Sequence, residues 1–224
     1  MYKCVVFDMD GTLVNSYQGI YQAYKAAFER MGRKWKGDSF VRRAIGAPLP
    51  FVFEQMCGMK REEAKQAIGY YRAYYGEKGW RELQVYPGMK ETLQELRGRN
   101  CFLGVATLKK ERFAEEILKE QGIFSCFDVV CGMDEQDRFA KSDLIRRCME
   151  KAGAQPGETI LIGDSEFDAQ GAKQAGVDFL AVTYGFGFGD KETCRRENIQ
   201  KIAESPADIL LQIEAPSPEC IYHQ

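Results

Sequence analysis

The stretch that decides the fold is Cys4-Val5-Val6-Phe7-Asp8-Met9-Asp10-Gly11-Thr12-Leu13. Its first four residues are apolar and have the length of a buried strand. Asp8 and Asp10 then share one face of the extended chain, and the turn at Gly11 follows at once. Two carboxylates this close together repel each other unless a cation neutralises them. An Asp-Gly turn after a strand is also common without any such site, so the stretch needs support from the rest of the chain.

Further short apolar runs alternate with amphipathic helical patterns along the chain. The expected strands are residues 4–7, 102–106, 127–131, 159–162, 179–182 and, more weakly, 209–211. This alternation predicts an α/β protein, with a mostly parallel sheet covered by helices on both faces. In such sheets, ligands bind beyond the carboxyl ends of the strands.

One long segment, residues 16–83, breaks the alternation. It contains helical patterns but no convincing strand, and we expect it to form an α-helical insert over the carboxyl edge of the sheet. Residues 1–15 and 84–224 would then form the core that carries the sheet. Four tyrosines in this segment lie at helical spacing and are expected to belong to its interior: Tyr70, Tyr71, Tyr74 and Tyr75.

The composition excludes several reaction mechanisms. The 224 residues include eight cysteines but a single histidine, His223, next to the last residue. That count argues against a Ser-His-Asp or Cys-His dyad, a His-ligated metal and a phosphohistidine. No cysteine is followed six positions later by arginine, and no CxxC pair occurs, so the cysteines are expected to be reduced packing thiols. With no usable histidine, catalysis is expected to rest on carboxylates, hydroxyls, lysines or cysteines.

The charge balance restricts the partners. There are 31 Lys and Arg against 33 Asp and Glu, a formal net charge of -2, which argues against a nucleic acid polymer or an anionic membrane as partner. No apolar run approaches the roughly 18 residues that span a bilayer. Asp8 interrupts the first apolar run before a signal-peptide core could form. We expect a cytoplasmic protein that is a monomer or a weak dimer.

Three further groups of polar residues follow expected strands or precede a helix. Thr107 directly follows the run at 102–106, and Lys141 stands ahead of a helical pattern. Asp164 and Asp168 follow Gly163 after the run at 159–162. Each has a structural explanation: a threonine or Asp168 can cap a helix, and an isolated lysine is usually on the surface. Asp164, directly after the glycine, has no comparable explanation.

Taken together and in order, these groups closely resemble the haloacid dehalogenase-like hydrolase superfamily over nearly the whole chain. The matching motifs are Asp-x-Asp-Gly-Thr, the threonine after a strand, the lysine and Gly-Asp-x-x-x-Asp. The helical insert is similar to the cap of the phosphoglycolate phosphatase-like branch, with Ile45-Gly46-Ala47-Pro48-Leu49 and Val85-Tyr86-Pro87-Gly88 adding to the match. The resemblance implies a Rossmann-like core.

The resemblance also implies roles for individual residues. Asp8 would be the nucleophile that forms an aspartyl-phosphate, and Asp10 the general acid and base. Thr107 would hydrogen-bond the transferring phosphoryl group, and Lys141 would neutralise its charge. Mg²⁺ would be held by the ligand set of the family, namely the Asp8 side chain, the Asp10 backbone carbonyl and Asp164, with Asp168 in support. An oxygen-only ligand set suits this hard cation.

The expected function is Mg²⁺-dependent hydrolysis of a small phosphorylated metabolite, of the phosphoglycolate or nucleoside monophosphate type. A phosphomutase acting on a sugar phosphate and a non-catalytic binding protein on the same fold remain the alternatives. Lys109, Arg43 and Gly46 are candidates for substrate contacts, and Arg42 and Arg72 could also meet a distal anion. Residues 185–189, Gly-Phe-Gly-Phe-Gly, lack the GxGxxG spacing and are expected to form a flexible loop near the cap.

Overall fold

The structure is a computed structural model that describes residues 2–213. His223 and Cys220 lie outside the described residues. Seven cysteines fall within them, and all seven are free thiols, as expected.

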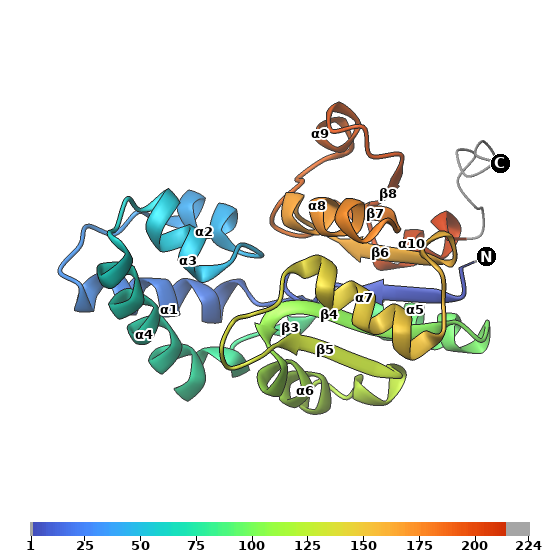
Figure 1. The fold of residues 1–224 in the computed structure, drawn as a ribbon, viewed down its shortest axis with the longest axis horizontal. Coiled ribbons are helices and arrows are strands. Elements are labelled where there is room, and N and C mark those ends of the chain that lie inside the picture. The colour runs from blue at the N-terminus through green and yellow to red at the C-terminus, as the bar shows by residue number, and fades with distance from the viewer. Residues whose placement is uncertain (1, 214–224) are drawn as a thin grey trace.

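The centre of the molecule is a six-stranded parallel sheet with the order β5-β4-β1-β6-β7-β8 (Figure 1). The strands are β1 (Cys4–Phe7), β4 (Phe102–Lys110), β5 (Val129–Met133), β6 (Thr159–Gly163), β7 (Asp178–Val182) and β8 (Lys201–Ala203). The chain builds the sheet outward from β1 to β5 on one side and then returns to β6 on the other. The ends of β4, β1 and β6 therefore surround a topological switch point, where parallel sheets bind ligands.

Helices cover both faces of this sheet, as the α/β pattern predicts. The alternation along β1 sends Val5 and Phe7 to one face and Cys4 and Val6 to the other. The first face packs on α5 (Met89–Gly98), α6 (Glu111–Glu120) and α10 (Pro206–Gln212), and the second on α7 (Lys141–Ala152) and α8 (Glu166–Ala175). A short helix, α9 (Lys191–Arg196), precedes β8.

The weakly expected strand at residues 209–211 is wrong. These residues belong to α10, and the sixth strand is β8, eight residues earlier in the chain. Ser205 caps α10 with its hydroxyl, accepting from the Asp208 backbone N–H, and Ile209 is buried against the sheet. A short apolar run cannot distinguish a strand from one turn of a buried helix, and here the cap decides.

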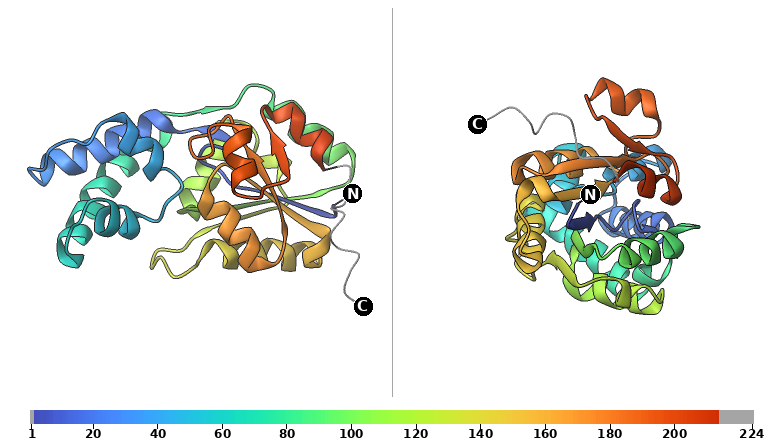
Figure 2. Two further views of the ribbon diagram at one scale, coloured as in Figure 1. Left: turned by 90° about the horizontal axis from the view of Figure 1, so that it is seen from above. Right: turned by 90° about the vertical axis from the view of Figure 1, so that its right-hand side faces the viewer.

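A helical insert lies between two very short strands, β2 (Val14–Asn15) and β3 (Gln84–Val85), which pair antiparallel. It contains α1 (Tyr17–Arg30), α2 (Asp38–Ala44), α3 (Leu49–Phe51), a π-helical segment (Val52–Met56), α4 (Arg61–Glu77) and a 3-10 turn (Gly79–Arg81). These helices form the blue-to-green part of the molecule, extending beyond one end of the sheet (Figures 1 and 2). Tyr24 and Tyr71 are buried in the aromatic interior of this part, with ring centroids 4.7 Å apart.

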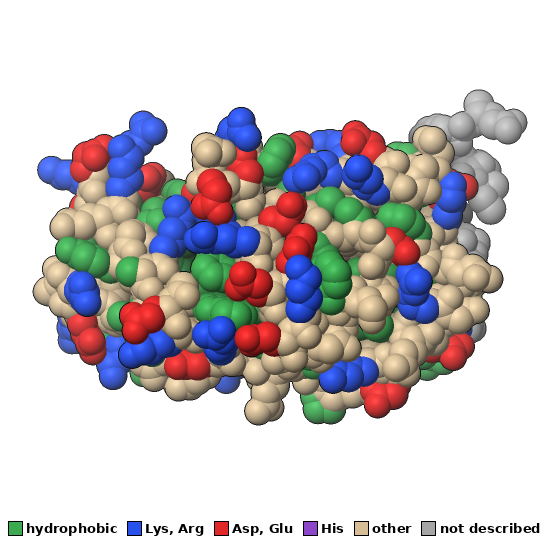
Figure 3. Space-filling model, turned by 90° about the horizontal axis from the view of Figure 1, so that it is seen from below, with side chains coloured by type: hydrophobic (Ala, Val, Ile, Leu, Met, Phe, Trp, Pro, Cys, Tyr) green, Lys and Arg blue, Asp and Glu red, His purple; other side chains and the backbone are tan. Residues whose placement is uncertain are grey.

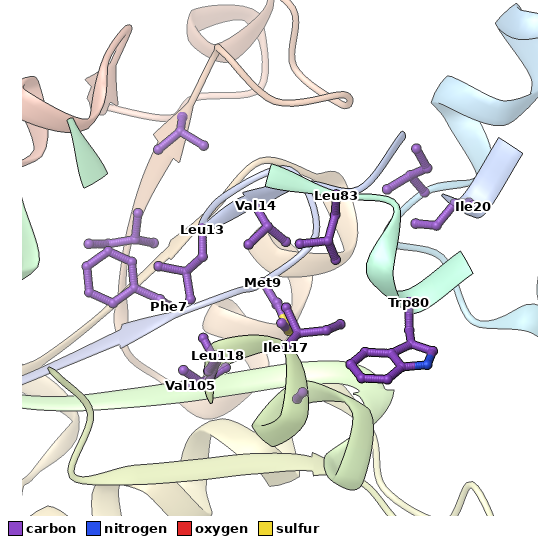
Figure 4. Packing of buried hydrophobic residues seen from close by; sticks show 14 of the residues in the cluster. Phe7, Met9, Leu13, Val14, Ile20, Trp80, Leu83, Val105, Ile117 and Leu118 are labelled. Carbon is purple, nitrogen blue, oxygen red and sulfur yellow. The ribbon is translucent and has the colours of Figure 1, made fainter. Parts of the chain in front are cut away.

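The interior of the insert is continuous with the core under the sheet. Figure 4 shows Met9, Leu13 and Val14 from the chain after β1 packed between the sheet residues and Leu83 and Trp80. All of these belong to one cluster of buried apolar side chains. The two parts therefore share one hydrophobic interior across the connecting strands.

The outer surface carries mixed charge. On the face shown in Figure 3, Lys and Arg side chains are interspersed with Asp and Glu. Among residues 2–213, none of the helices combines the length and apolarity needed to cross a bilayer.

Candidate active site

The strand register brings the sequence-predicted side chains to one level. Phe7 in β1 pairs with Val105 in β4 on one side and with Ile162 in β6 on the other. Asp8 follows Phe7 directly, while Thr107 and Asp164 each stand two residues beyond these partners. Because the strands are parallel, all three side chains emerge at the same edge, and all three are buried. A cavity of about 360 Å³ opens there, lined by residues of both the sheet edge and the insert.

Lys141 lies beside Asp8 at the first turn of α7. Its Nζ contacts Asp8 Oδ1 and is 2.6 Å from Asp168 Oδ1, with only 6% of the side chain exposed. Burial lowers the pKa of a lysine, but the two carboxylates more than offset this effect and raise the pKa of Lys141. The ammonium group therefore stays charged next to the carboxylate of Asp8.

Asp168 holds this lysine in place. Its second oxygen, Oδ2, accepts hydrogen bonds from Ser165 N at 3.1 Å and from Ser165 Oγ at 2.6 Å. Ser165 and Asp168 form a capping box at the start of α8, which fixes the carboxylate relative to the helix. Both oxygens of Asp168 thus have partners within the described residues.

Asp164 is held by the glycine-rich segment at residues 185–189. Its Oδ2 accepts hydrogen bonds from Phe186 N at 2.7 Å and Gly187 N at 3.3 Å, and Phe188 N donates to its backbone oxygen at 3.0 Å. A side chain at Gly185 would collide with Asp164 and with the backbone of Gly11. The segment lies near the insert, as expected, but it is packed as a clamp on Asp164 rather than as a loose loop.

The carboxylates fit a divalent cation. One oxygen each of Asp8, Asp164 and Asp168 lies within 4.8 Å of the others. Asp8 Oδ2 and Asp164 Oδ1 are buried with no hydrogen-bond partner in the described part of the chain. Burial and the neighbouring Asp168 raise the pKa of Asp8 to about 7, and burial with Asp168 and Asp8 raises the pKa of Asp164 well above its usual range. Unpaired buried carboxylate oxygens are what a hard cation ligates.

Asp10 takes a different partner. Its Oδ2 is 2.9 Å from Lys109 Nζ, and its Oδ1 is buried without a partner among the described residues. Lys109 also donates to the hydroxyl of Tyr75 in α4, at 2.6 Å. Lys109 therefore lines the cavity, where it is engaged by Asp10 and by the insert.

Of the other candidates for substrate contact, two line the cavity. Gly46 lines the cavity, with a φ of 84°, and Arg72 lines it while pairing with Asp137 at 2.6 Å. Arg43 is exposed, donates to the Ser39 carbonyl, and borders a different surface depression. The structure therefore does not bring Arg43 to the carboxylates.

Sequence reasoning missed two residues of the site, Tyr75 and Ser165. Tyr75 lies four positions after Tyr71, a spacing that predicts a core residue. Its ring is indeed buried, but its hydroxyl accepts a hydrogen bond from Lys109. Ser165 could have been found from the Ser-x-x-Asp spacing, which is typical of a capping box.

The fold and the site define an α/β protein with buried carboxylates and a lysine at the switch point of a parallel sheet, where such proteins bind their ligands. The family model described as haloacid dehalogenase-like hydrolase matches residues 5–182. The chain belongs to this family.

Several known proteins are similar to the chain over most of its length. A 5'-nucleotidase of Pseudomonas aeruginosa is 33% identical over 191 residues, covering 85% of this chain and 86% of that protein. A phosphoglycolate phosphatase of Pseudomonas savastanoi pv. phaseolicola is 30% identical, covering 98% and 80%. The crystal structure of a predicted phosphatase from Clostridium acetobutylicum superposes with a TM-score of 0.89 at 32% identity, covering 95% and 98%.

A relative with another name matches equally well. The tyrosine-protein kinase PtkA of Mycobacterium tuberculosis is 32% identical over 189 residues, which cover 84% of this chain. The match spans only 64% of the length of that kinase.

Proposed function

We propose that this protein is a Mg²⁺-dependent phosphatase that hydrolyses a small phosphomonoester through an aspartyl-phosphate. The observation that carries the proposal is the pair of contacts at Asp8. This buried carboxylate lines the cavity, is fixed by Lys141 through one oxygen, and keeps its other oxygen without a partner among the described residues.

Asp8 attacks the phosphorus atom, and the bond from phosphorus to the leaving oxygen breaks as the new bond forms. Lys141 compensates negative charge on the carboxylate and on the phosphoryl oxygens, since its pKa keeps it protonated. Thr107 is buried within β4, and its hydroxyl accepts from Lys109 N at 3.2 Å, so its own proton would be donated to a phosphoryl oxygen. Mg²⁺ bound by Asp8, Asp164 and the Asp10 backbone, with Asp168 in support, would supply further charge neutralisation for transfer.

Asp10 handles the protons. It gives a proton to the leaving oxygen in the first step and takes one from the attacking water in the second, when the aspartyl-phosphate is hydrolysed to phosphate and Asp8 is restored. Its position two residues after Asp8, on the same face of the chain, supports this division of roles.

Residues 16–83 would act as the cap domain over a core of residues 1–15 and 84–224. The pairing of β2 with β3 at the junction and the cavity between the two parts support this division. A cavity of about 360 Å³ suits a small metabolite. The relatives named 5'-nucleotidase and phosphoglycolate phosphatase make nucleoside monophosphates and phosphoglycolate the first substrates to try.

The test is release of phosphate from p-nitrophenyl phosphate. The wild-type protein is expected to be active with Mg²⁺ and inactive in EDTA, and Asp8→Asn should lose activity by about 10⁴-fold or more because the nucleophile is gone. Asp190→Asn is the matched control, because Asp190 caps α9 on the surface, and it should retain full activity.

Turnover without metal, or an active Asp8→Asn protein, would contradict the mechanism. Measuring free phosphate against the released alcohol separates hydrolysis from transfer. Equal amounts identify a phosphatase, while a phosphate deficit would point to a phosphomutase or a kinase.

A further inference from the structure

A lysine connects the insert to the proposed acid–base residue. Lys109, near the end of β4, places its Nζ 2.9 Å from Asp10 Oδ2 and 2.6 Å from the Tyr75 hydroxyl. The Lys109 and Asp10 side chains are 7% and 13% exposed. Tyr75 belongs to α4 of the insert, so this contact crosses from one part of the molecule to the other.

The position of the Tyr75 hydroxyl is defined by its surroundings. The ring stacks on Tyr71 at 5.9 Å and meets Phe113 of α6 edge-on at 5.8 Å. Lys109 Nζ also lies over the Tyr75 ring, 4.4 Å from its centroid. Because aromatic packing fixes the ring, the hydroxyl fixes the lysine in turn.

The lysine orients the carboxylate of Asp10. A buried ammonium is costly unless it is paired, and Lys109 has two partners, Asp10 and Tyr75. With Asp10 Oδ2 bound to the lysine, Oδ1 is the oxygen without a partner among the described residues, and it is the one that remains for proton exchange.

We propose that Tyr75 is a positioning residue for proton transfer, which acts through Lys109 to orient Asp10 when the insert is seated on the core. The inference rests on the proposed phosphatase function and adds a dependence on the insert. The acid is then held in place only while α4 lies against the sheet edge, so protonation of the leaving group is tied to closure of the cavity.

The proposal makes a prediction that packing alone does not. An alkoxide is a strongly basic leaving group and needs a proton in the transition state, whereas p-nitrophenolate leaves readily without one. Misplacing Asp10 should therefore reduce phosphoryl transfer from an alkyl phosphate far more than from p-nitrophenyl phosphate.

The experiment measures kcat/KM of Tyr75→Phe for ethyl phosphate and for p-nitrophenyl phosphate, because kcat/KM reports the step that releases the alcohol. We expect the alkyl value to fall about tenfold, part of the roughly 10²–10⁴-fold that such proton transfer contributes, while the aryl value stays within about twofold. Tyr74→Phe, on the same helix but not lining the cavity, is the matched control and should leave the ratio unchanged. Thermal unfolding of both variants checks the fold.

Equal loss on both substrates would mean that the hydroxyl only supports packing, and no loss on either would mean that it has no role. Both results overturn the inference while leaving the phosphatase intact. A wild-type protein that hydrolyses neither ester would instead overturn the proposed function.

Discussion

Opposing electrostatic effects determine the pKa of Asp8. Burial and the nearby Asp168 raise its pKa, Lys141 lowers it, and the balance is about 7 against an ordinary value of 3.8. A carboxyl whose pKa is raised in the folded state binds its proton more tightly there than in the unfolded chain. Its stabilising contribution is therefore present below about pH 3.8 and is lost as the pH rises to about 7.

This sign gives a stability prediction for the metal-free protein. From pH 4 to pH 8, the free energy of unfolding of Asp8→Asn should rise relative to wild type by about 4 kcal/mol, because asparagine does not ionise. Chemical denaturation in EDTA at several pH values measures this difference.

The control variant, Asp190→Asn, should show the opposite dependence of stability on pH. The pKa of the exposed Asp190 is lowered, chiefly by the Thr193 backbone N–H, so Asp190→Asn should lose stability relative to wild type as the pH rises. If the difference in free energy of unfolding between Asp8→Asn and wild type does not change with pH, the pKa of Asp8 is not raised in the folded protein.

At the scale of elements, the clamp formed by residues 185–189 on Asp164 should control metal affinity. In Gly185→Ala, the added methyl group would collide with Asp164 and displace the segment that orients it. We expect Mg²⁺ affinity to fall by about 10–100-fold, the range typical of lost supporting contacts around a ligand. The rise in melting temperature on titration with Mg²⁺ measures this affinity.

The matched control is Gly157→Ala, where an added methyl group meets no atom within 4 Å. It should bind Mg²⁺ as wild type does. Wild-type affinity in Gly185→Ala would show that the clamp does not matter for the cation.

What the sequence could predict depended on whether a general rule of the fold places the residues. Strand ends in a parallel sheet meet at one edge, so the strand pattern was enough to place Asp8, Thr107 and Asp164 together. No such rule covers the Asp164 clamp or the Tyr75 contact, which depend on how individual side chains and loops pack. The predicted strand at residues 209–211 was wrong for another reason, since a short apolar run fits a buried turn of helix as well as a strand.

At the scale of the whole molecule, the shared hydrophobic interior should couple the insert to the core during unfolding. Both tryptophans, Trp35 and Trp80, lie in the insert, so their fluorescence reports on that part and, through Trp80, on its contact with Phe113 of α6. Far-UV circular dichroism reports on all helices and strands. We expect the two signals to give coincident denaturant transitions, because one continuous apolar cluster joins the two parts.

Trp80→Ala sharpens this prediction, since it removes a buried side chain near the junction shown in Figure 4. It should lower the free energy of unfolding by about 3–5 kcal/mol. The whole circular dichroism transition should therefore move to lower denaturant concentration. A fluorescence transition in wild type that precedes the circular dichroism transition would show that the insert unfolds independently.

The pairing of β2 with β3 has an evolutionary consequence. Val14 lies directly opposite Val85, so the chain leaves the sheet and returns to it at neighbouring points. A segment with adjacent ends can be shortened, enlarged or exchanged for another fold without changing the strand order. The sheet requires only that the chain leave and return at the same two points. The same sheet edge, with Asp8 and its neighbours in place, could thus receive different ligands when the segment inserted at this junction is replaced.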